Sequence, residues 1–144
     1  MPGIIVGIDG STHSRQALEW AINEAAVRHA PLTVLTVHQA LASHWGGPHP
    51  ADQDLAKRAR EAAEEETDIV LGKFGEEERP PSVTVRAATG VPAEQLLDAA
   101  GGADMIVVGA RGAGGFKRLL MGSVCTQVTH HAHCPVVVIP VDKA

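Results

Sequence analysis

Residues 104–123 read DMIVVGARGAGGFKRLLMGS and join three features that together indicate one class of fold. Met105 to Val108 is a short apolar run rich in β-branched residues, which is typical of a strand buried on both faces. The run ends at Gly109, a glycine-rich stretch follows, and a helix is expected to begin at Ser123. A buried strand, a loop at its carboxyl end and a helix, in this order, predict an α/β protein.

Four further apolar runs have the same character as Met105 to Val108. Each is short, rich in β-branched residues and bounded by polar or turn residues, so each predicts a strand. In chain order the five expected strands are Ile4 to Ile8, Leu32 to Val37, Val83 to Ala87, Met105 to Val108, and Val136 to Ile139.

Helical patterns lie between the expected strands. The expected helices are Ser14 to His29, Asp52 to Phe74, Ala93 to Ala100, and Ser123 to about Ala132. This alternation predicts a parallel sheet with right-handed crossovers and helices on both faces. Ala40 to Ala51 is expected to be a loop, and the run Glu76-Glu77-Glu78 a solvated turn. Because the chain has 144 residues and no internal repeat, residues 1–144 are expected to form a single domain.

Charge and composition exclude several classes of protein. The formal net charge is −5, whereas nucleic-acid-binding domains usually carry a basic face. Arg111, Lys117 and Arg118 form a small basic cluster, large enough to meet one polyphosphate but too small for a duplex. The chain has no apolar run near the roughly 18 residues of a membrane span, and no secretory signal. We therefore expect a cytoplasmic protein that binds neither nucleic acid nor membrane.

The glycine-rich stretch has the chemistry of a phosphate-binding loop. Gly109 and Gly112 would let a phosphate or ribose approach the backbone closely, because glycine has no Cβ. Gly122 and Ser123 stand at the start of the last expected helix, where free N–H groups and the helix dipole favour anions. The stretch is not a Walker A loop, because no lysine precedes Ser123. A long loop that ends in a helix cap would also explain the pattern.

A second feature lies at the carboxyl end of the first expected strand, which ends at Asp9-Gly10-Ser11. Asp9 is placed to accept hydrogen bonds from a ribose hydroxyl, or to lie near a metal ion. Alternatively, Asp9 caps the following helix.

Histidine and cysteine residues suggest two other sites, which we weigh against simpler explanations. His130, His131, His133 and Cys134 are crowded together, but zinc sites usually show clearer paired spacing, and histidines at a helix C-terminus need no metal. No metal site is therefore expected. Cys125 falls in the first turn of the last helix, where a helix N-terminus could activate a thiol, although an inward-packed side chain explains it as well.

Several segments of the chain resemble the universal stress protein family, in its ATP-binding type. The matching segments are VGIDGS at 6–11, LTVLTVH at 32–38, TGVP at 89–92, DMIVVGARG at 104–112, GFKRLLMGS at 115–123 and HCPVVVIP at 133–140. The pattern G-x2-G-x9-G-[ST], which separates the nucleotide-binding members of the family from the others, is complete here. The resemblance covers nearly the whole chain, except that Ala40 to Ala51 matches no pattern of the family.

The resemblance implies a role for particular residues. Asp9 corresponds to the acidic residue near the ribose, and Val37 to the position whose backbone contacts adenine. Gly109 and Gly112 correspond to the ribose and phosphate glycines. The phosphate-binding start of the last helix corresponds to Gly122, Ser123 and Val124. Gly90 is expected near the same cleft, and Arg111, in the basic cluster, completes the expected nucleotide-binding residues.

The resemblance also implies a Rossmann-like domain with strand order 3-2-1-4-5. The ligand cleft would then lie where the strand order reverses, between strands one and four. Strand five would be an edge, yet Val136 to Ile139 is uniformly apolar, which an exposed edge usually avoids. The expected cover is the same strand of a second copy, as in a homodimer, although a helix or the C-terminal tail would also serve.

We therefore expect an ATP-binding universal stress protein that acts in stress response or signalling and holds ATP with or without Mg²⁺. An AMP- or cyclic AMP-binding module and a slow ATPase are the alternatives. Hydrolysis requires a positioned water and charge stabilisation on the γ-phosphate, and no catalytic base is evident in the sequence. Efficient catalysis is therefore not expected.

Overall fold

The computed structural model describes residues 3–38, 52–110 and 123–140. Five strands and four α-helices alternate along these residues, together with one short 3-10 helix. The strands are β1 (Ile4–Ile8), β2 (Leu32–His38), β3 (Val83–Thr89), β4 (Met105–Gly109) and β5 (Val136–Ile139). The helices are α1 (Thr12–Arg28), α2 (Asp52–Leu71), η1 (Glu76–Glu78), α3 (Pro92–Ala99) and α4 (Ser123–His131).

The strands form one parallel sheet in the order β3-β2-β1-β4-β5. The chain first moves outward from β1 to β2 and β3, then returns to the other side of β1 for β4 and β5. This confirms the expected order 3-2-1-4-5, including its reversal between β1 and β4. Because crossovers are right-handed, helices on connections that run in opposite directions along the sheet cover opposite faces.

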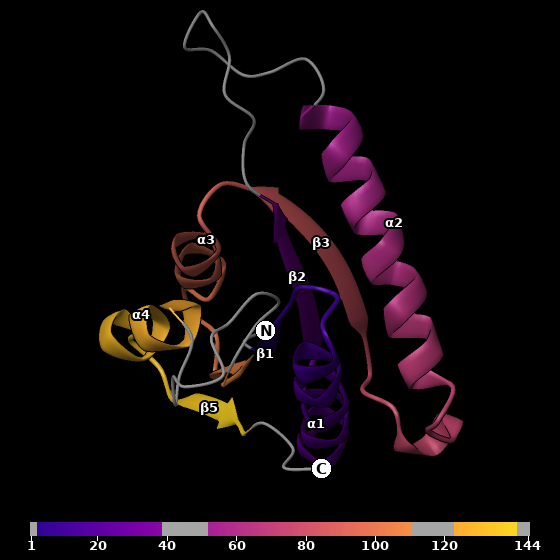
Figure 1. Cartoon of the computed structure of the whole chain (residues 1–144). Helices are drawn as coiled ribbons and strands as arrows, with labels where there is room; N and C mark the ends of the chain where they lie inside the picture. The colour runs from indigo at the N-terminus through magenta and orange to yellow at the C-terminus, as the bar shows by residue number, and fades with distance from the viewer. Residues whose placement is uncertain (1–2, 39–51, 111–122, 141–144) are drawn as a thin grey trace, which may run out of the picture.

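The helices accordingly form two layers, one on each face of the sheet, as Figure 1 shows. Side chains alternate between these faces along each strand. In β1, for example, Ile4, Val6 and Ile8 belong to the apolar cluster beneath α1 and α2. Ile5 belongs to the cluster beneath α3 and α4, where the buried residues include Leu96. The expected three-layer α/β architecture is therefore confirmed.

Local signals explain where the helices begin and end. Ser11 is the N-cap of α1, and its hydroxyl accepts a hydrogen bond from the backbone N–H of Ser14. At the other end His29 adopts the left-handed conformation with φ of 55°, and Pro31 follows shortly afterwards. Pro92 occupies the first turn of α3, where a missing N–H has no cost.

The bounds of several elements differ from the sequence-based expectation. The strands β2, β3 and β4 each run one or two residues further, because the pairing of neighbouring strands continues to His38↔Thr89 and Gly109↔Ile139. The helix α2 ends at Leu71 instead of Phe74, since the N–H of Phe74 bonds to Leu71 in a tighter turn. Glu76–Glu78 forms a 3-10 helix where a simple turn was expected.

Candidate functional site

The first feature of the site is that β1 stops short of both its neighbours. Its pairing with β2 ends at Ile8↔Thr36, and its pairing with β4 ends at Val6↔Val107. The strand β2 continues to His38 and β4 continues to Gly109. The carboxyl ends of β2 and β4 therefore flank the space beyond the end of β1, which is the point where the strand order reverses.

Backbone groups of β2 and β4 point into that space. The carbonyl of His38 accepts a hydrogen bond of 2.9 Å from the N–H of Gly90, so the backbone groups of His38 face β3. Successive residues of a strand direct these groups to opposite sides, and those of Val37 therefore face the β1 side. By the same reasoning, the 2.8 Å bond from Ala110 N–H to the Ile139 carbonyl means that Gly109 faces the β1 side too.

The turn after β1 is built by polar hydrogen bonds around Asp9. Its carboxylate oxygen Oδ1 accepts from the N–H of Ser11 at 2.9 Å, and its own N–H donates to the hydroxyl of Ser14 at 3.1 Å. Gly10 lies between Asp9 and Ser11 with φ of +82°, a conformation that favours glycine. Since Ser11 is the N-cap of α1, the alternative that Asp9 caps this helix is wrong; Asp9 shapes the turn instead. Asp9 is exposed at the carboxyl edge of the sheet.

Gly90 joins β3 to α3 at the same edge. Its φ of +142° is strained for any other residue, and a Cβ at this position would lie 3.0 Å from the side-chain Nε2 of Gln95. The neighbouring side chains reinforce the junction, because His38 Nε2 lies 3.0 Å from the hydroxyl of Thr89. Gly90 therefore serves the packing of α3 against the end of β3, and its N–H anchors the end of β2.

The start of α4 presents polar and apolar side chains together. Ser123 is exposed, whereas Val124 is half-buried. Val124 and Val37 both pack against the apolar cluster beneath α3 and α4. The first turn of α4 and the end of β2 are thus supported by the same part of the core.

The last three expected nucleotide-binding residues, Arg111, Gly112 and Gly122, lie outside the described residues. The same holds for Lys117 and Arg118 of the basic cluster, and for the expected loop Ala40 to Ala51. Six of the nine expected positions are therefore described: Asp9, Val37, Gly90, Gly109, Ser123 and Val124.

Cys125 packs inward from α4 and is 1% exposed. Burial raises the pKa of its thiol, which is the opposite of what an activated nucleophile needs. The pKa of Cys134 is raised as well, first by burial and then by the charge of Asp104. Both cysteines are free. The interpretation of Cys125 as an inward-packed residue is confirmed.

In the described part of the chain, histidines, cysteines and carboxylates form no group of three that could hold a metal ion. His130 and His131 lie with ring centroids 6.5 Å apart, and both are exposed. Among the helices described, none has both the length and the apolar character that a membrane span requires.

Sequence reasoning left Gly7 without a role, although it lies in the run VGIDGS at 6–11. A Cβ on Gly7 would lie 2.9 Å from Leu96 Cδ1, so glycine is what allows α3 to pack closely on β1. An isolated glycine inside an apolar strand was the available signal, since it often marks a close approach. The side-chain contact between His38 and Thr89 had no signal in the sequence, because it depends on strand register.

Together, these features define a doubly wound α/β protein with polar turns and open backbone groups at its topological switch point. The sequence profile of the universal stress protein family matches residues 2–140, and the chain belongs to this family. A universal stress protein of Mycolicibacterium smegmatis is 37% identical over 143 residues, which cover 97% of this chain and 48% of the relative. The chain thus spans about half the length of the curated relatives it matches.

Solved structures of universal stress proteins have the same fold. UspA from Lactobacillus plantarum is 28% identical with a TM-score of 0.77, and the match covers 96% of this chain and 97% of the other. A universal stress protein in complex with cAMP matches at 22% identity and a TM-score of 0.68, covering 96% of each chain. One from Archaeoglobus fulgidus in complex with dAMP matches at 24% identity and a TM-score of 0.67, covering 96% and 98%.

Proposed function

We propose that this chain binds an adenine nucleotide, with ATP as the main ligand, at the switch point formed by the carboxyl ends of β1, β2 and β4. The observation that carries the proposal is that the carbonyl of Val37 and the backbone groups of Gly109 are directed from either side into the space beyond β1. A strand-end carbonyl can accept from the amino group of adenine, and a glycine at a strand end leaves room for ribose.

The neighbouring polar groups suit the remaining parts of a nucleotide. Asp9 is exposed beside this space, and a carboxylate is a strong acceptor for ribose hydroxyls. Ser123 begins α4, whose N-terminal N–H groups and dipole favour phosphate. Arg111, Gly112 and Gly122 are proposed to complete the phosphate site on the basis of the sequence pattern G-x2-G-x9-G-S. A Mg²⁺ ion bound together with ATP belongs to the same proposal.

The choice of ATP is tested by calorimetric titration with ATP, AMP and cyclic AMP. We expect ATP to bind about tenfold more tightly than AMP, because charge-assisted hydrogen bonds to the additional phosphates contribute to affinity. Mass spectrometry of nucleotide released from the purified protein identifies the ligand independently. Absence of ATP binding at millimolar concentration would refute the proposal.

A monophosphate ligand is the second candidate, and the two solved family members with cAMP and dAMP favour it. The adenosine part of either ligand would use the same strand ends as ATP. In the titration, equal affinities for AMP and ATP would mean that the phosphate loop contributes little. The chain would then be a monophosphate-binding module.

We propose a role in stress response or signalling in which nucleotide binding changes the association of the protein with others, and not efficient catalysis. Slow ATP hydrolysis is the enzymatic alternative, and phosphate release from the pure protein measures it. Among the described residues the exposed carboxylate of Asp9 already takes part in the turn, which makes it a poor general base. The cytoplasm is the compartment we propose, because free thiols persist where the environment is reducing.

We further propose that residues 1–144 act as one domain and that two copies pair through β5. The strand β5 lies at the edge of the sheet, and its four residues are all half-buried. Pro135 and Ile139 direct their carbonyls to β4, so Val136 and Val138 direct their backbone groups outward. A second β5 could pair with these open groups, as the family resemblance implies.

A further inference from the structure

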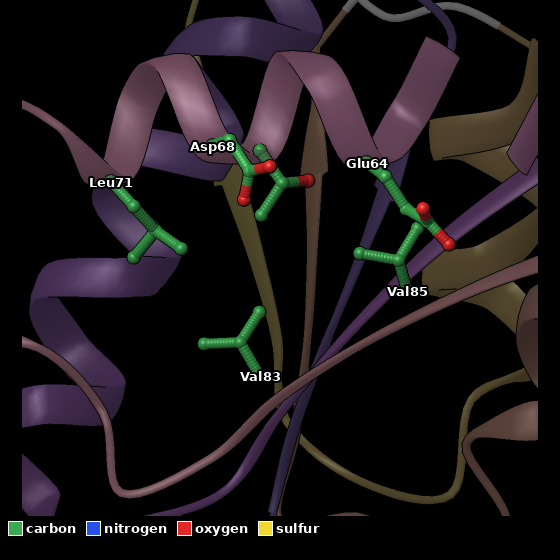
Figure 2. A pocket seen from close by; sticks show the side chains of 6 residues that line it. Glu64, Asp68, Leu71, Val83 and Val85 are labelled. Atoms are coloured by element: carbon green, nitrogen blue, oxygen red, sulfur yellow. The ribbon is translucent and has the colours of Figure 1, made fainter. Parts of the chain in front are cut away.

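A groove that opens to solvent lies between α2 and β3, away from the switch point. It has a volume of about 280 Å³ and is lined by Glu64, Thr67, Asp68, Leu71, Val83 and Val85. Figure 2 shows Asp68 and Leu71 on the side of Val83, and Glu64 on the side of Val85. Its β3 side is therefore aliphatic, and its α2 side carries two carboxylates one helical turn apart.

The size of the groove limits what it can hold. Sites for cofactors and drug-sized ligands have volumes of roughly 300–1,000 Å³ and bury most of the ligand. At about 280 Å³, this groove lies just below that range and is open on one side. It suits a few side chains of another polypeptide better than a free small molecule.

The backbone beside the groove is available for strand pairing. The strand β3 stands at the edge of the sheet, with β2 as its one neighbour among the described strands. The carbonyl of Ser82 and the N–H of Gly90 both bond to β2, at 3.0 and 2.9 Å. Even-numbered residues of β3 thus face β2, and Val83, Val85 and Ala87 direct their N–H and C=O groups outward. Such an edge is a template for an additional strand.

The spacing of the two carboxylates matches an extended chain. Glu64 and Asp68 are four residues apart on α2, which corresponds to about 6 Å along a helix. Alternate residues of a strand are about 6.6 Å apart and point to the same face. The two spacings agree closely enough for two side chains of an added strand to meet both carboxylates, since α2 runs alongside β3 (Figure 1).

The charges in and beside the groove favour a basic occupant. Both carboxylates are exposed, and Arg60 approaches Glu64 at 3.5 Å in an ion pair whose side chains are each about half exposed. Such a pair is weak and can be displaced. Lysine and arginine combine an aliphatic stem with a charged end, so the stem can pack on Val83 and Val85 while the end reaches a carboxylate. A second copy of this chain, with net charge −5, is a poorer match.

We infer that the α2–β3 groove is a docking site for an extended segment of another protein that carries Lys or Arg at two alternate positions. The segment adds a strand to β3 and directs its basic side chains toward Glu64 and Asp68. Its intervening side chain lies on the other face of the sheet, beside the exposed Thr84 and Arg86, and is small or acidic. This site is independent of nucleotide binding at the switch point.

The test uses the blocked heptapeptide Ser-Lys-Thr-Lys-Thr-Lys-Ser and the ¹⁵N-labelled protein in an NMR titration. We expect saturable shifts of the outward-facing amides of Val83, Val85 and Ala87. Replacing both carboxylates, with Glu64→Gln and Asp68→Asn, should weaken binding about threefold to tenfold, as expected for two exposed ion pairs. The peptide with Glu in place of Lys should give no saturable shift.

Two controls separate docking from general attraction to an acidic protein. The pair Glu61→Gln and Glu65→Gln removes the same charge from exposed positions of α2 that do not line the groove. It should leave the affinity nearly unchanged. Two N-methylated peptides are compared, one methylated at the backbone nitrogens of both threonines and one at that of the middle lysine. Only one of the two should lose binding, because only alternate residues of the peptide direct their N–H groups to β3. Equal effects of the two variant pairs, equal binding of the methylated peptides, or no saturable shift would overturn the inference.

Discussion

At the scale of single residues, Asp9 combines a structural role with a proposed functional one. Its Oδ1 atom holds the turn through the N–H of Ser11, and the residue remains exposed at the carboxyl edge of the sheet. Asp9 could be chosen as a candidate site residue from the sequence, because an acidic residue after a buried strand is a conspicuous signal. Its part in the turn could not, because that depends on the φ of Gly10 and on where α1 begins.

Asp9→Asn separates the two roles of this residue. The amide oxygen of Asn can still accept from Ser11, so the turn and the melting temperature should be preserved. The charge is lost, and the affinity for ATP should fall about tenfold to a hundredfold, because hydrogen bonds to charged groups contribute roughly 1.5–3 kcal/mol. Calorimetry measures the affinity. Unchanged affinity together with an unchanged melting temperature would mean that Asp9 only shapes the turn.

At the scale of elements, the contact between α3 and β1 depends on a missing side chain. Leu96 of α3 is 3% exposed and lies against Gly7 of β1, where a Cβ would come within 2.9 Å of Leu96 Cδ1. The same helix is held at its N-terminus by the junction at Gly90. The existence of α3 was predictable from Pro92 and the apolar spacing. Its distance from the sheet was not, because two residues far apart in the chain determine it.

Gly7→Val should destabilise the protein by about 1–3 kcal/mol, because a larger side chain in a packed core forces neighbours out of place. Chemical denaturation measures the free energy of unfolding. Leu96→Ala provides the matched partner, since it removes the atoms that the new side chain would meet. The double variant should lose less stability than the sum of the single variants. Strict additivity would contradict the contact as the cause.

At the scale of the whole molecule, the sheet has two edges of different character. At one end, β3 lies beside the acidic groove beneath α2; at the other, β5 is apolar and its residues pack on both helical layers. The sequence indicated the apolar nature of β5, and the family resemblance implied its place at an edge. The proposed pairing of β3 with an outside segment had no signal in the sequence, because the groove is formed by residues from two separate elements.

Val138→Pro tests pairing through β5. The N–H of Val138 points away from β4, so proline should preserve the internal sheet while it removes a donor for a second copy. We expect a dimer to become a monomer in analytical ultracentrifugation. Val138→Ala is the control, because it shortens the side chain but keeps the N–H. If both variants remain dimeric, β5 is not the interface.

The sequence by itself determined the class of fold, the alternation of strands and helices, and the residues proposed to bind a nucleotide. The fold class and most of these residues follow from local signals: apolar runs, glycines at strand ends and helix caps. The choice of Val37, Gly90 and Val124 follows from the family resemblance. The tertiary structure decided what depends on register and packing. It set β1 shorter than its neighbours, directed the backbone groups of Val37 and Gly109 toward the space beyond β1, and formed the groove beside β3. These properties arise between segments distant in the chain, where local preference carries no information about distance or direction.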